Sequence, residues 1–210
     1  MKFLITAGPT REPIDPVRYI SNRSSGKMGY AIAQAALDAG HEVTLISGPV
    51  AIEAPANARV VRVETADEMF DAVHANLADI DAAVLCAAVA DFKPARIASE
   101  KIKKNDGIPA IELMPTRDIL ASLGKILKKN FLLIGFAAET NDLEKNAQKK
   151  LKTKRCDAII GNRISTANPV FERDENEVVI FCKDGSQRAL PRMSKTQLAC
   201  ELVKIFSSMK

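Results

Sequence analysis

The sequence predicts an α/β fold built on a doubly wound, mostly parallel sheet. Short apolar runs alternate with longer amphipathic ones through the first half of the chain. The runs 3–7 and 81–88 are apolar almost throughout, as expected of strands that are buried on both faces. Capping-box sequences begin two of the amphipathic runs, at Thr65 and at Ser194. This alternation is typical of a parallel sheet that carries helices on both faces.

The individual elements follow from the same patterns, in chain order. Strands of the sheet are predicted at residues 3–7, 42–47, 58–63, 81–88, 131–137 and 156–161, with a further extended run at 110–113. Helices are predicted at residues 26–39, 65–78, 116–129, 142–154 and from 194 to near the end. Residues 177–182 and 187–190 flank a Lys-Asp-Gly-Ser turn and predict a β-hairpin. The fold is therefore expected to be Rossmann-like, with helices on both faces of the sheet and a small β-hairpin near the C-terminal end.

Length and composition narrow the class of protein. The 210 residues predict a single domain over 1–210, and the 47% of hydrophobic residues are enough for a sizeable core. The net charge of +4 is too small to indicate a nucleic-acid-binding protein. The four cysteines form no C-x-x-C pair and the two histidines stand apart, so we expect reduced thiols, a cytoplasmic location and no zinc site. No apolar run approaches the roughly 18 residues of a membrane-spanning helix, so no membrane association is expected.

Polar residues follow several predicted strands at the point where each strand ends. Gly8-Pro9-Thr10 follows the first strand, Asp91 follows the strand at 81–88, and Glu139 follows the strand at 131–137. In a doubly wound sheet, ligands bind at the carboxyl ends of the strands. We therefore expect a ligand crevice at this edge, although polar residues also end strands for purely structural reasons.

The most informative segment is residues 21–29, Ser-Asn-Arg-Ser-Ser-Gly-Lys-Met-Gly, which leads into the helix predicted at 26–39. A helix N-terminus presents unpaired N–H groups and a positive partial charge, and small residues in front of it allow a phosphate or carboxylate to approach. The segment does not match a P-loop. The dinucleotide fingerprint is missing as well, because 17 residues separate Gly8 from Gly26. The structural alternative is a plain loop with a helix cap.

Lysines mark two further candidate regions. On the helix at 142–154, Lys150 and Lys154 project within or beside the apolar stripe, which indicates either ligand-bound lysines or stems that run along the helix to solvent. The polar segment 89–109 carries Lys101 among several lysines. This segment is either a solvated run of charges or a mobile basic loop that closes over a triphosphate.

The chain resembles one enzyme family in a series of motifs that cover nearly its whole length. The motifs are ITAGPTREPID at 5–15, YISNRSSGKMG at 19–29, AAVADF at 87–92, EKIKK at 100–104 and GFAAET at 135–140. Together they are similar to the phosphopantothenate–cysteine ligases of coenzyme A biosynthesis. In many bacteria this domain follows a flavin-containing decarboxylase in one polypeptide. The resemblance therefore implies a stand-alone ligase or an excised ligase domain, functionally coupled to such a decarboxylase.

The resemblance implies a two-step ligation. The carboxylate of phosphopantothenate attacks the α-phosphorus of a nucleoside triphosphate, CTP in most bacterial members, and gives an acyl-cytidylate and pyrophosphate. The amine of cysteine then displaces CMP and forms the amide of phosphopantothenoylcysteine. Because several anions meet in one site, Mg²⁺ and cationic groups are expected there. The sequence does not indicate which residues would hold the metal.

Roles for individual residues also follow from the resemblance. Asn22 is expected to hydrogen-bond the acyl group, and Lys101 on a flexible flap is expected to act in the second step or to hold the phosphates. Arg18 is expected to reach the site of a neighbouring subunit. The remaining nucleotide contacts implied are Cys86, Ala87, Ala88, Asp91, Arg117, Asp118, Ile119, Leu120, Phe136, Lys150 and Lys154. The substrate contacts assigned to the two glycine-containing motifs are Gly8, Ser24, Ser25, Gly26 and Lys27.

Two points in the resemblance concern the second half of the chain. Arg117 stands where familiar bacterial members have proline, so contact at this position is expected to come from the backbone. The resemblance also implies a homodimer, with the strands at 156–192 involved in pairing and residues 178–181 as candidates.

Other functions stay open on sequence alone. A nicotinamide- or flavin-dependent oxidoreductase fits the strand–helix–strand start but lacks the glycine fingerprint. A regulatory nucleotide-binding domain would bind CTP without releasing pyrophosphate. Use of ATP in place of CTP would keep the ligation and change only the nucleotide.

Overall fold

The computed structural model describes residues 1–104, 110–163 and 173–210. Its main sheet consists of β1 (Lys2–Ala7), β4 (Glu42–Ser47), β5 (Arg59–Arg62), β6 (Ala82–Leu85), β9 (Leu132–Glu139), β10 (Ala158–Arg163), β11 (Glu175–Cys182) and β12 (Gln187–Ser194). The strands lie in the order β12-β11-β10-β9-β6-β1-β4-β5. All neighbours from β5 to β10 are parallel, whereas β11 and β12 are antiparallel.

The strand order confirms the predicted doubly wound topology. From β1 the chain moves through β4 to β5 on one side, then returns and continues through β6, β9 and β10 on the other. The order therefore reverses between β1 and β6, whose residues Phe3 and Ala82 are register partners. In this type of sheet the reversal leaves a crevice beyond the carboxyl ends of the two strands.

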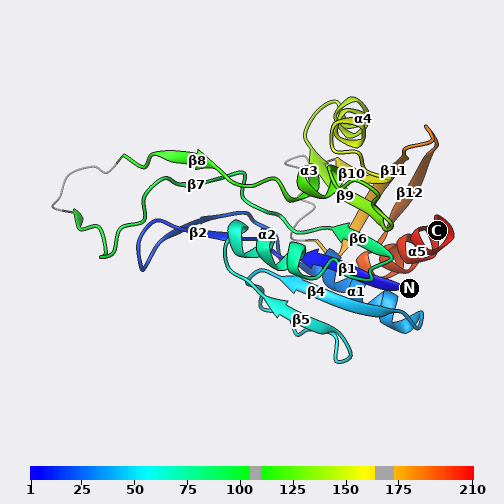
Figure 1. Cartoon of the computed structure of the whole chain (residues 1–210), viewed down its shortest axis with the longest axis horizontal. Helices are drawn as coiled ribbons and strands as arrows, with labels where there is room; N and C mark the ends of the chain where they lie inside the picture. Colours follow the sequence, from blue (N-terminus) through cyan, green and yellow to red (C-terminus); the bar gives the residue numbers. More distant parts are fainter. Residues whose placement is uncertain (105–109, 164–172) are drawn as a thin grey trace.

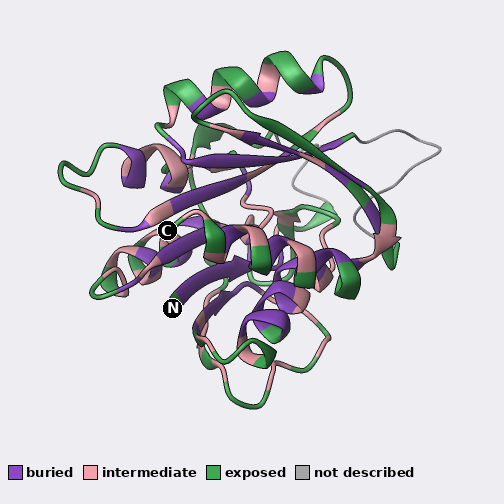
Figure 2. Cartoon of the chain, turned by 90° about the vertical axis from the view of Figure 1, so that its right-hand side faces the viewer, coloured by how far each residue is buried: buried purple, intermediate pink, exposed green. Residues whose placement is uncertain are grey.

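Helices cover both faces of the sheet. The helices are α1 (Lys27–Asp38), α2 (Ala66–Ala75), α3 (Ile119–Gly124), α4 (Leu143–Thr153) and α5 (Lys195–Ser208). On one face, Ile5 of β1 lies in a buried cluster with Ile32 of α1 and Leu202 of α5. On the other, Leu4 clusters with residues of α2, α3 and α4. Figure 2 shows the result, with buried strands between helices that are exposed on their outer sides.

Local signals explain where most helices begin. Both predicted capping boxes are present: the side chain of Thr65 accepts from the backbone of Glu68, and that of Ser194 accepts from Gln197. The helix predicted at 116–129 is wrong at both ends, since the structure caps α3 with Asp118 and ends it at Gly124. A Cβ on Gly124 would lie 1.8 Å from the carbonyl oxygen of Lys154, so the end of α4 closely approaches this helix and leaves room for glycine alone.

Two short hairpins form a projection that the sequence did not predict. Strands β2 (Arg11–Pro13) and β3 (Tyr19–Ser21) pair with each other, as do β7 (Phe92–Pro94) and β8 (Leu113–Pro115). The extended run predicted at 110–113 thus overlaps β8 only at Leu113. We call residues 11–21, 91–104 and 110–116 the arm, and Figure 1 shows it extending away from the main sheet. Strands of three residues are too short for a periodic pattern to reveal them.

The hairpin near the C-terminal end is confirmed, and its strands β11 and β12 extend the main sheet. Of its candidate dimer residues 178–181, Val178, Ile180 and Phe181 are at most 3% exposed, because they pack into the two buried clusters between the sheet and the helices. Among the described helices, none is long and apolar enough to span a membrane.

Candidate functional site

Helix α1 begins directly beside the end of β1, and glycines make this approach possible. The N-cap Gly26 has a φ of 78° in the left-handed region, and no side chain caps the helix. A Cβ on Gly26 would lie 3.3 Å from the Cα of Gly8, and one on Gly29 would lie 2.6 Å from the Cβ of Ala7. The N-terminal turn of α1 therefore faces the crevice at the reversal of strand order, with backbone N–H groups that carry no side-chain cap.

A cavity of about 130 Å³ lies in front of this helix end. It is lined by the predicted residues Ser24, Ser25, Gly26, Lys27, Cys86, Ala87, Ala88 and Phe136. The lining also includes residues that were not predicted, namely Met28, Gly29, Ala138, Asn162, Asn176 and Lys195. The structure thus confirms a cavity at the carboxyl edge of the sheet. Its volume suits a phosphoryl or acyl-phosphate group, so a whole nucleotide would extend beyond it along the crevice.

Two lysines make this cavity electropositive. Lys195, the first residue of α5, is only 6% exposed. Burial and the nearby charge of Lys27 lower the pKa of Lys195. Lys27 itself lies on the first turn of α1 and donates to Oδ1 of Asp174 at 2.6 Å. Because both cations face the same cavity as a helix N-terminus, an anion placed there would stabilise the arrangement.

Buried amides form another part of the lining. Nδ2 of Asn176 donates to Oδ1 of Asn162 at 3.0 Å, and the two residues are 4% and 7% exposed. Sequence reasoning missed both, and it treated Lys195 only as part of a capping box. Two signals could have found them: Asn162 stands near the carboxyl end of a parallel strand, and a lysine in the first turn of a helix opposes the helix dipole.

The end of β6 is tied to its neighbours through backbone groups. Nδ2 of Asn22 donates to the carbonyl oxygen of Ala88 at 2.9 Å, which places this exposed amide at the edge of the cavity. The N–H of Ala88 donates to the carbonyl of Gly8 at 2.9 Å, and that of Ala87 donates to Oγ1 of Thr6 at 3.1 Å. Since both N–H groups are engaged, a ligand that bonds to this backbone would donate to its carbonyl oxygens.

Cys86 lines the cavity but is poorly suited to nucleophilic chemistry. Burial raises the pKa of its thiol to about 12. The thiol therefore stays protonated at neutral pH, whereas the thiolate is the reactive form. We assign Cys86 to the wall of the site.

Arg117 lies outside the cavity and binds helix α2. Its Nε donates to Oδ1 of Asp67 at 2.9 Å, its Nη1 donates to Asp71 at 2.7 Å, and its guanidinium lies 4.1 Å from the ring centroid of Phe70. Asp118 caps α3, Ile119 is 6% exposed, and the side chain of Leu120 fills the space beside Gly135. These residues join helices together, and the structure does not bring their side chains into the cavity.

Lys150 and Lys154 lie beside the buried face of α4, as predicted. Their side chains are 33% and 29% exposed. Nζ of Lys154 is 2.5 Å from Oδ2 of Asp118, and Nζ of Lys150 is 4.0 Å from Oε1 of Glu139. Both lysines are thus paired with carboxylates, and neither lines the cavity at the N-terminus of α1.

Arg18 and Lys101 belong to the arm. Arg18 binds the buried carboxylate of Asp15 and also donates to the carbonyl of Ile102 at 2.7 Å. The hydrogen bond from Arg18 holds the pKa of Asp15 well below its usual range. Lys101 is exposed next to this contact, and Asp91 is exposed at the base of the arm. The structure therefore places Asn22 at the cavity but leaves Lys101 and Arg18 on a projection (Figure 1).

The described residues, 1–104, 110–163 and 173–210, contain no preformed metal site of carboxylate, imidazole or thiol side chains. No group of three or more His, Cys, Asp or Glu side chains in that part of the chain is arranged to hold a metal ion.

The chain is similar to known proteins over nearly its whole length. The family model described as "DNA/pantothenate metabolism flavoprotein C-terminal domain" matches residues 1–209. The coenzyme A biosynthesis bifunctional protein CoaBC of Vibrio vulnificus (strain YJ016) is 47% identical over 204 residues, which are 96% of this chain and 51% of that protein. The CoaBC of Bacillus subtilis (strain 168) is 47% identical over 202 residues, 96% of this chain and 50% of that protein.

A solved structure shows the same fold. The crystal structure of the C-terminal domain of a CoaBC protein is 42% identical, with a TM-score of 0.85, and the match covers 99% of this chain and 94% of that one. The chain spans about half the length of the two curated relatives that it matches.

Proposed function

Since the chain belongs to the family of DNA/pantothenate metabolism flavoprotein C-terminal domains, we propose that it ligates phosphopantothenate to cysteine in coenzyme A biosynthesis. The similarity to CoaBC proteins supports this activity, and the match to a separate C-terminal domain indicates which half of those proteins corresponds to this chain. Coupling to a flavin-dependent decarboxylase is part of the proposal, because the curated relatives are bifunctional.

One observation of the structure carries the proposal: the uncapped N-terminus of α1 faces the same cavity as Lys27 and Lys195. A ligation through an acyl-nucleotide gathers the carboxylate, the α-phosphoryl group and the departing pyrophosphate in one place. Backbone N–H groups and two lysines stabilise such charge without any rearrangement.

In the first proposed step, a carboxylate oxygen of phosphopantothenate bonds to the α-phosphorus of the nucleotide, and the bond from that phosphorus to pyrophosphate breaks. The N-terminus of α1 and Lys27 hold the phosphoryl oxygens, and the buried ammonium of Lys195 offsets the negative charge that accumulates. Asn22 lies at the cavity edge, where Nδ2 can donate to the acyl oxygen by exchanging its bond to Ala88.

In the second proposed step, the amine nitrogen of cysteine bonds to the acyl carbon and the bond to the nucleoside monophosphate oxygen breaks. The amine gives up a proton to solvent water, and the nucleoside monophosphate leaves with the electron pair of the broken bond. An uncharged amide at Asn22 can donate to the acyl oxygen and does not repel the incoming amine.

We propose CTP as the nucleotide and Mg²⁺ as its counter-ion. Contacts of the base with the carbonyl oxygens near Ala87 and Ala88 suit an amino group on the base, which both cytosine and adenine possess. Among the described residues, those that line the cavity include no carboxylate, which is the usual protein ligand of Mg²⁺. The ion does not fit as a resident of this cavity, and no step above runs through it.

We also propose a homodimer in which the arm reaches a second copy of the chain. Seven large apolar side chains on the arm are exposed: Val17, Tyr19, Phe92, Ile97, Ile111, Leu113 and Met114. Exposed apolar groups of this number on one projection indicate a protein interface. Such a dimer would bring Arg18 and Lys101 towards the partner's cavity, which explains why they lie away from the cavity of their own chain.

Pyrophosphate release tests the proposed function. The protein is incubated with phosphopantothenate, Mg²⁺ and either CTP or ATP, with and without cysteine. We expect continuous turnover only with cysteine present, and faster turnover with CTP. A preference for ATP would support the ligation but reject CTP as the nucleotide. Folded protein that binds CTP but releases no pyrophosphate in any mixture would be a regulatory binding domain, and the ligase would be rejected.

A further inference from the structure

A second cavity lined by described residues lies at the opposite edge of the sheet from the candidate site. Its volume is about 660 Å³, within the range of small-molecule sites. Asp157, which precedes β10, and Cys182, which ends the antiparallel β11, both line it, so it opens at the amino ends of the parallel strands. No residue of this cavity has a part in the function proposed above.

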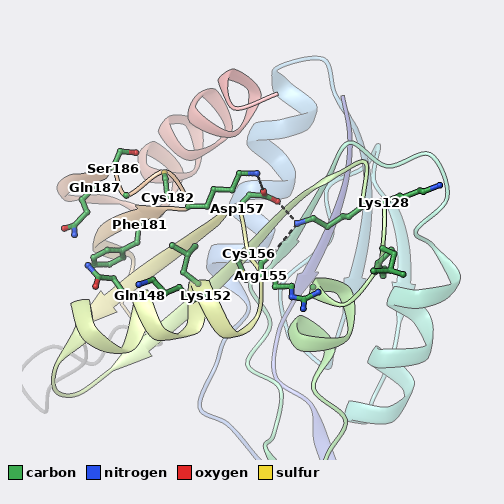
Figure 3. Close-up of a pocket in the computed structure, with 17 residues that line it drawn as sticks. Lys128, Gln148, Lys152, Arg155, Cys156, Asp157, Phe181, Cys182, Ser186 and Gln187 are labelled. Carbon is green, nitrogen blue, oxygen red and sulfur yellow. Dashed lines mark hydrogen bonds and ion pairs between the residues drawn. The ribbon is translucent and has the colours of Figure 1, made fainter.

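A buried carboxylate organises the centre of this cavity. Oδ2 of Asp157 accepts from Nζ of Lys129 and its Oδ1 accepts from Nζ of Lys183, each at 2.6 Å. Burial raises the pKa of Asp157, but these bonds and the N–H of Leu133 outweigh burial and lower it. Figure 3 shows Asp157 near the middle of the lining, with Lys152, Gln148 and Phe181 on one side and Lys128 on the other.

The remaining charges of the lining are all positive. Lys128, Lys152 and Arg155 line the cavity, and none of the three forms an ion pair within the described residues. With one carboxylate against five basic side chains, the lining is strongly electropositive. The partial negative charge at the C-terminal end of α4 favours some cations there. Lys183 lies on the hairpin of β11 and β12 and Lys128 precedes β9, so the helix dipole does not account for these two.

Two of these cations occupy positions where glycine would be favoured. Lys128 and Arg155 have φ values of 59° and 50°, in the left-handed region. Arg155 follows the C-cap of α4, and the bond from Cys156 N to Leu151 O closes the turn there, an arrangement that usually selects glycine. A basic side chain is present at both positions despite a cost of roughly 1–2 kcal/mol each in backbone strain.

Apolar side chains complete the cavity. Leu127 is 85% exposed and Ile126 36%, and apart from the arm these are the two large apolar residues that are exposed in the described part of the chain. Both line this cavity, together with Leu151 and Phe181. An apolar wall beside unpaired cations fits a ligand that has an apolar body and an anionic head.

We propose that this cavity is a second ligand site, which takes a small amphipathic anion. The apolar part would lie against Ile126, Leu127 and Phe181, and the anionic head would bind Lys152 and Arg155. The triad of Lys129, Asp157 and Lys183 holds the segment before β9, the start of β10 and the hairpin together around it. The inference stands apart from the ligase proposal, because it uses neither the residues nor the edge of the sheet that the ligase uses.

Hexyl phosphate is the probe that tests the second site, with neutral hexyl glucoside as its uncharged counterpart. Binding to the full chain is measured by calorimetry and located by amide chemical shifts. We expect hexyl phosphate to shift Gln148, Ser186 and Gln187, and the glucoside to bind at least tenfold more weakly. The double variant Lys152→Gln/Arg155→Gly should lose at least tenfold in affinity for hexyl phosphate. The glycine at 155 suits the left-handed backbone, so the variant keeps its fold.

The matched control is Lys145→Gln/Lys149→Gln, which removes two exposed charges from the same helix outside the cavity. Its affinity for hexyl phosphate should stay within twofold of the parent. Three results would overturn the proposal: equal loss in both double variants, which indicates non-specific attraction; shifts confined to Gly26 and Ala88, which locate the probe at the candidate site; and no binding.

Discussion

Gly8 and Gly26 lie against each other in the structure, although 17 residues separate them in the sequence. The hairpin of β2 and β3 is inserted between the end of β1 and the start of α1, and it brings the chain back to the end of β1. The glycine-rich turn that other doubly wound folds form from one continuous motif is therefore divided here between two segments. The absence of the fingerprint from the sequence reflects an insertion rather than a different site.

The first prediction concerns this contact. Gly26→Ala places a Cβ 2.7 Å from Cγ1 of Val50 on a left-handed residue, whereas Gly40→Ala adds a Cβ to an equally left-handed residue with open space around it. We expect Gly40→Ala to lower the free energy of unfolding by roughly 1–2 kcal/mol, and Gly26→Ala to lower it further. Denaturant unfolding of both variants measures the difference. Equal losses would show that crowding at Gly26 is unimportant.

The second prediction concerns the buried lysine. Lys195→Met removes a cation from the candidate site and keeps the volume of the side chain. We expect kcat/KM for the nucleotide to fall at least tenfold, because the site loses a cation that would offset the charge of the phosphoryl groups. Lys204→Met is the control, since Lys204 is 72% exposed on the same helix. A lower melting temperature with normal activity in Lys195→Met would assign the residue to folding alone.

The third prediction concerns Asn22. Asn22→Asp replaces the donor that bonds to Ala88 with an acceptor, and its negative charge repels the acyl-phosphate. We expect turnover to fall on the order of 100-fold, with CTP binding retained and stability changed by less than about 0.5 kcal/mol. Asn57→Asp, at an exposed position away from the cavity, serves as control. Full activity of Asn22→Asp would exclude this side chain from the mechanism.

The fourth prediction is a dependence of stability on pH. The lysines hold the pKa of Asp157 below its ordinary value of 3.8, so the ionised carboxylate stabilises the fold above that pH. Asp157→Asn should lower the free energy of unfolding by about 3 kcal/mol at pH 7. This is the low end of the range for a buried ion pair, because Lys183 is exposed. This deficit should shrink as the pH falls from 3.8 towards the lowered pKa. A deficit independent of pH would indicate packing rather than charge.

The fifth prediction concerns the arm. Ile97→Ser/Leu113→Ser removes two exposed apolar side chains, so the proposed dimer should dissociate while each chain keeps its fold. Sedimentation velocity measures the assembly, and circular dichroism checks the fold. Leu127→Ser, an exposed apolar position outside the arm, should leave the assembly intact. A monomeric parent protein, or a dimer that survives the double change, would contradict the interface.

The sequence alone determined the elements whose signals are local. The fully apolar runs predicted β1 and β6, and side-chain caps at Thr65 and Ser194 predicted the starts of α2 and α5. The strand-end rule also located the crevice, because parallel strands bring their carboxyl ends to one edge. The segment 21–29 predicted the helix start that faces it, whereas Cys86, Ala87, Ala88 and Phe136 came from the resemblance to the ligase family. These features depend on residues that are close together in the chain, so a pattern can reveal them.

Tertiary structure decided everything that depends on contacts between distant segments. It brought Lys195 and Asn176 to the cavity from the C-terminal part of the chain, and it turned Arg117 towards Asp67 and away from the cavity. It also placed Lys101 on an arm made of strands too short to leave a periodic signal. A side chain's partners are set by where the backbone carries it, and burial and charge at such contacts arise only once the segments meet.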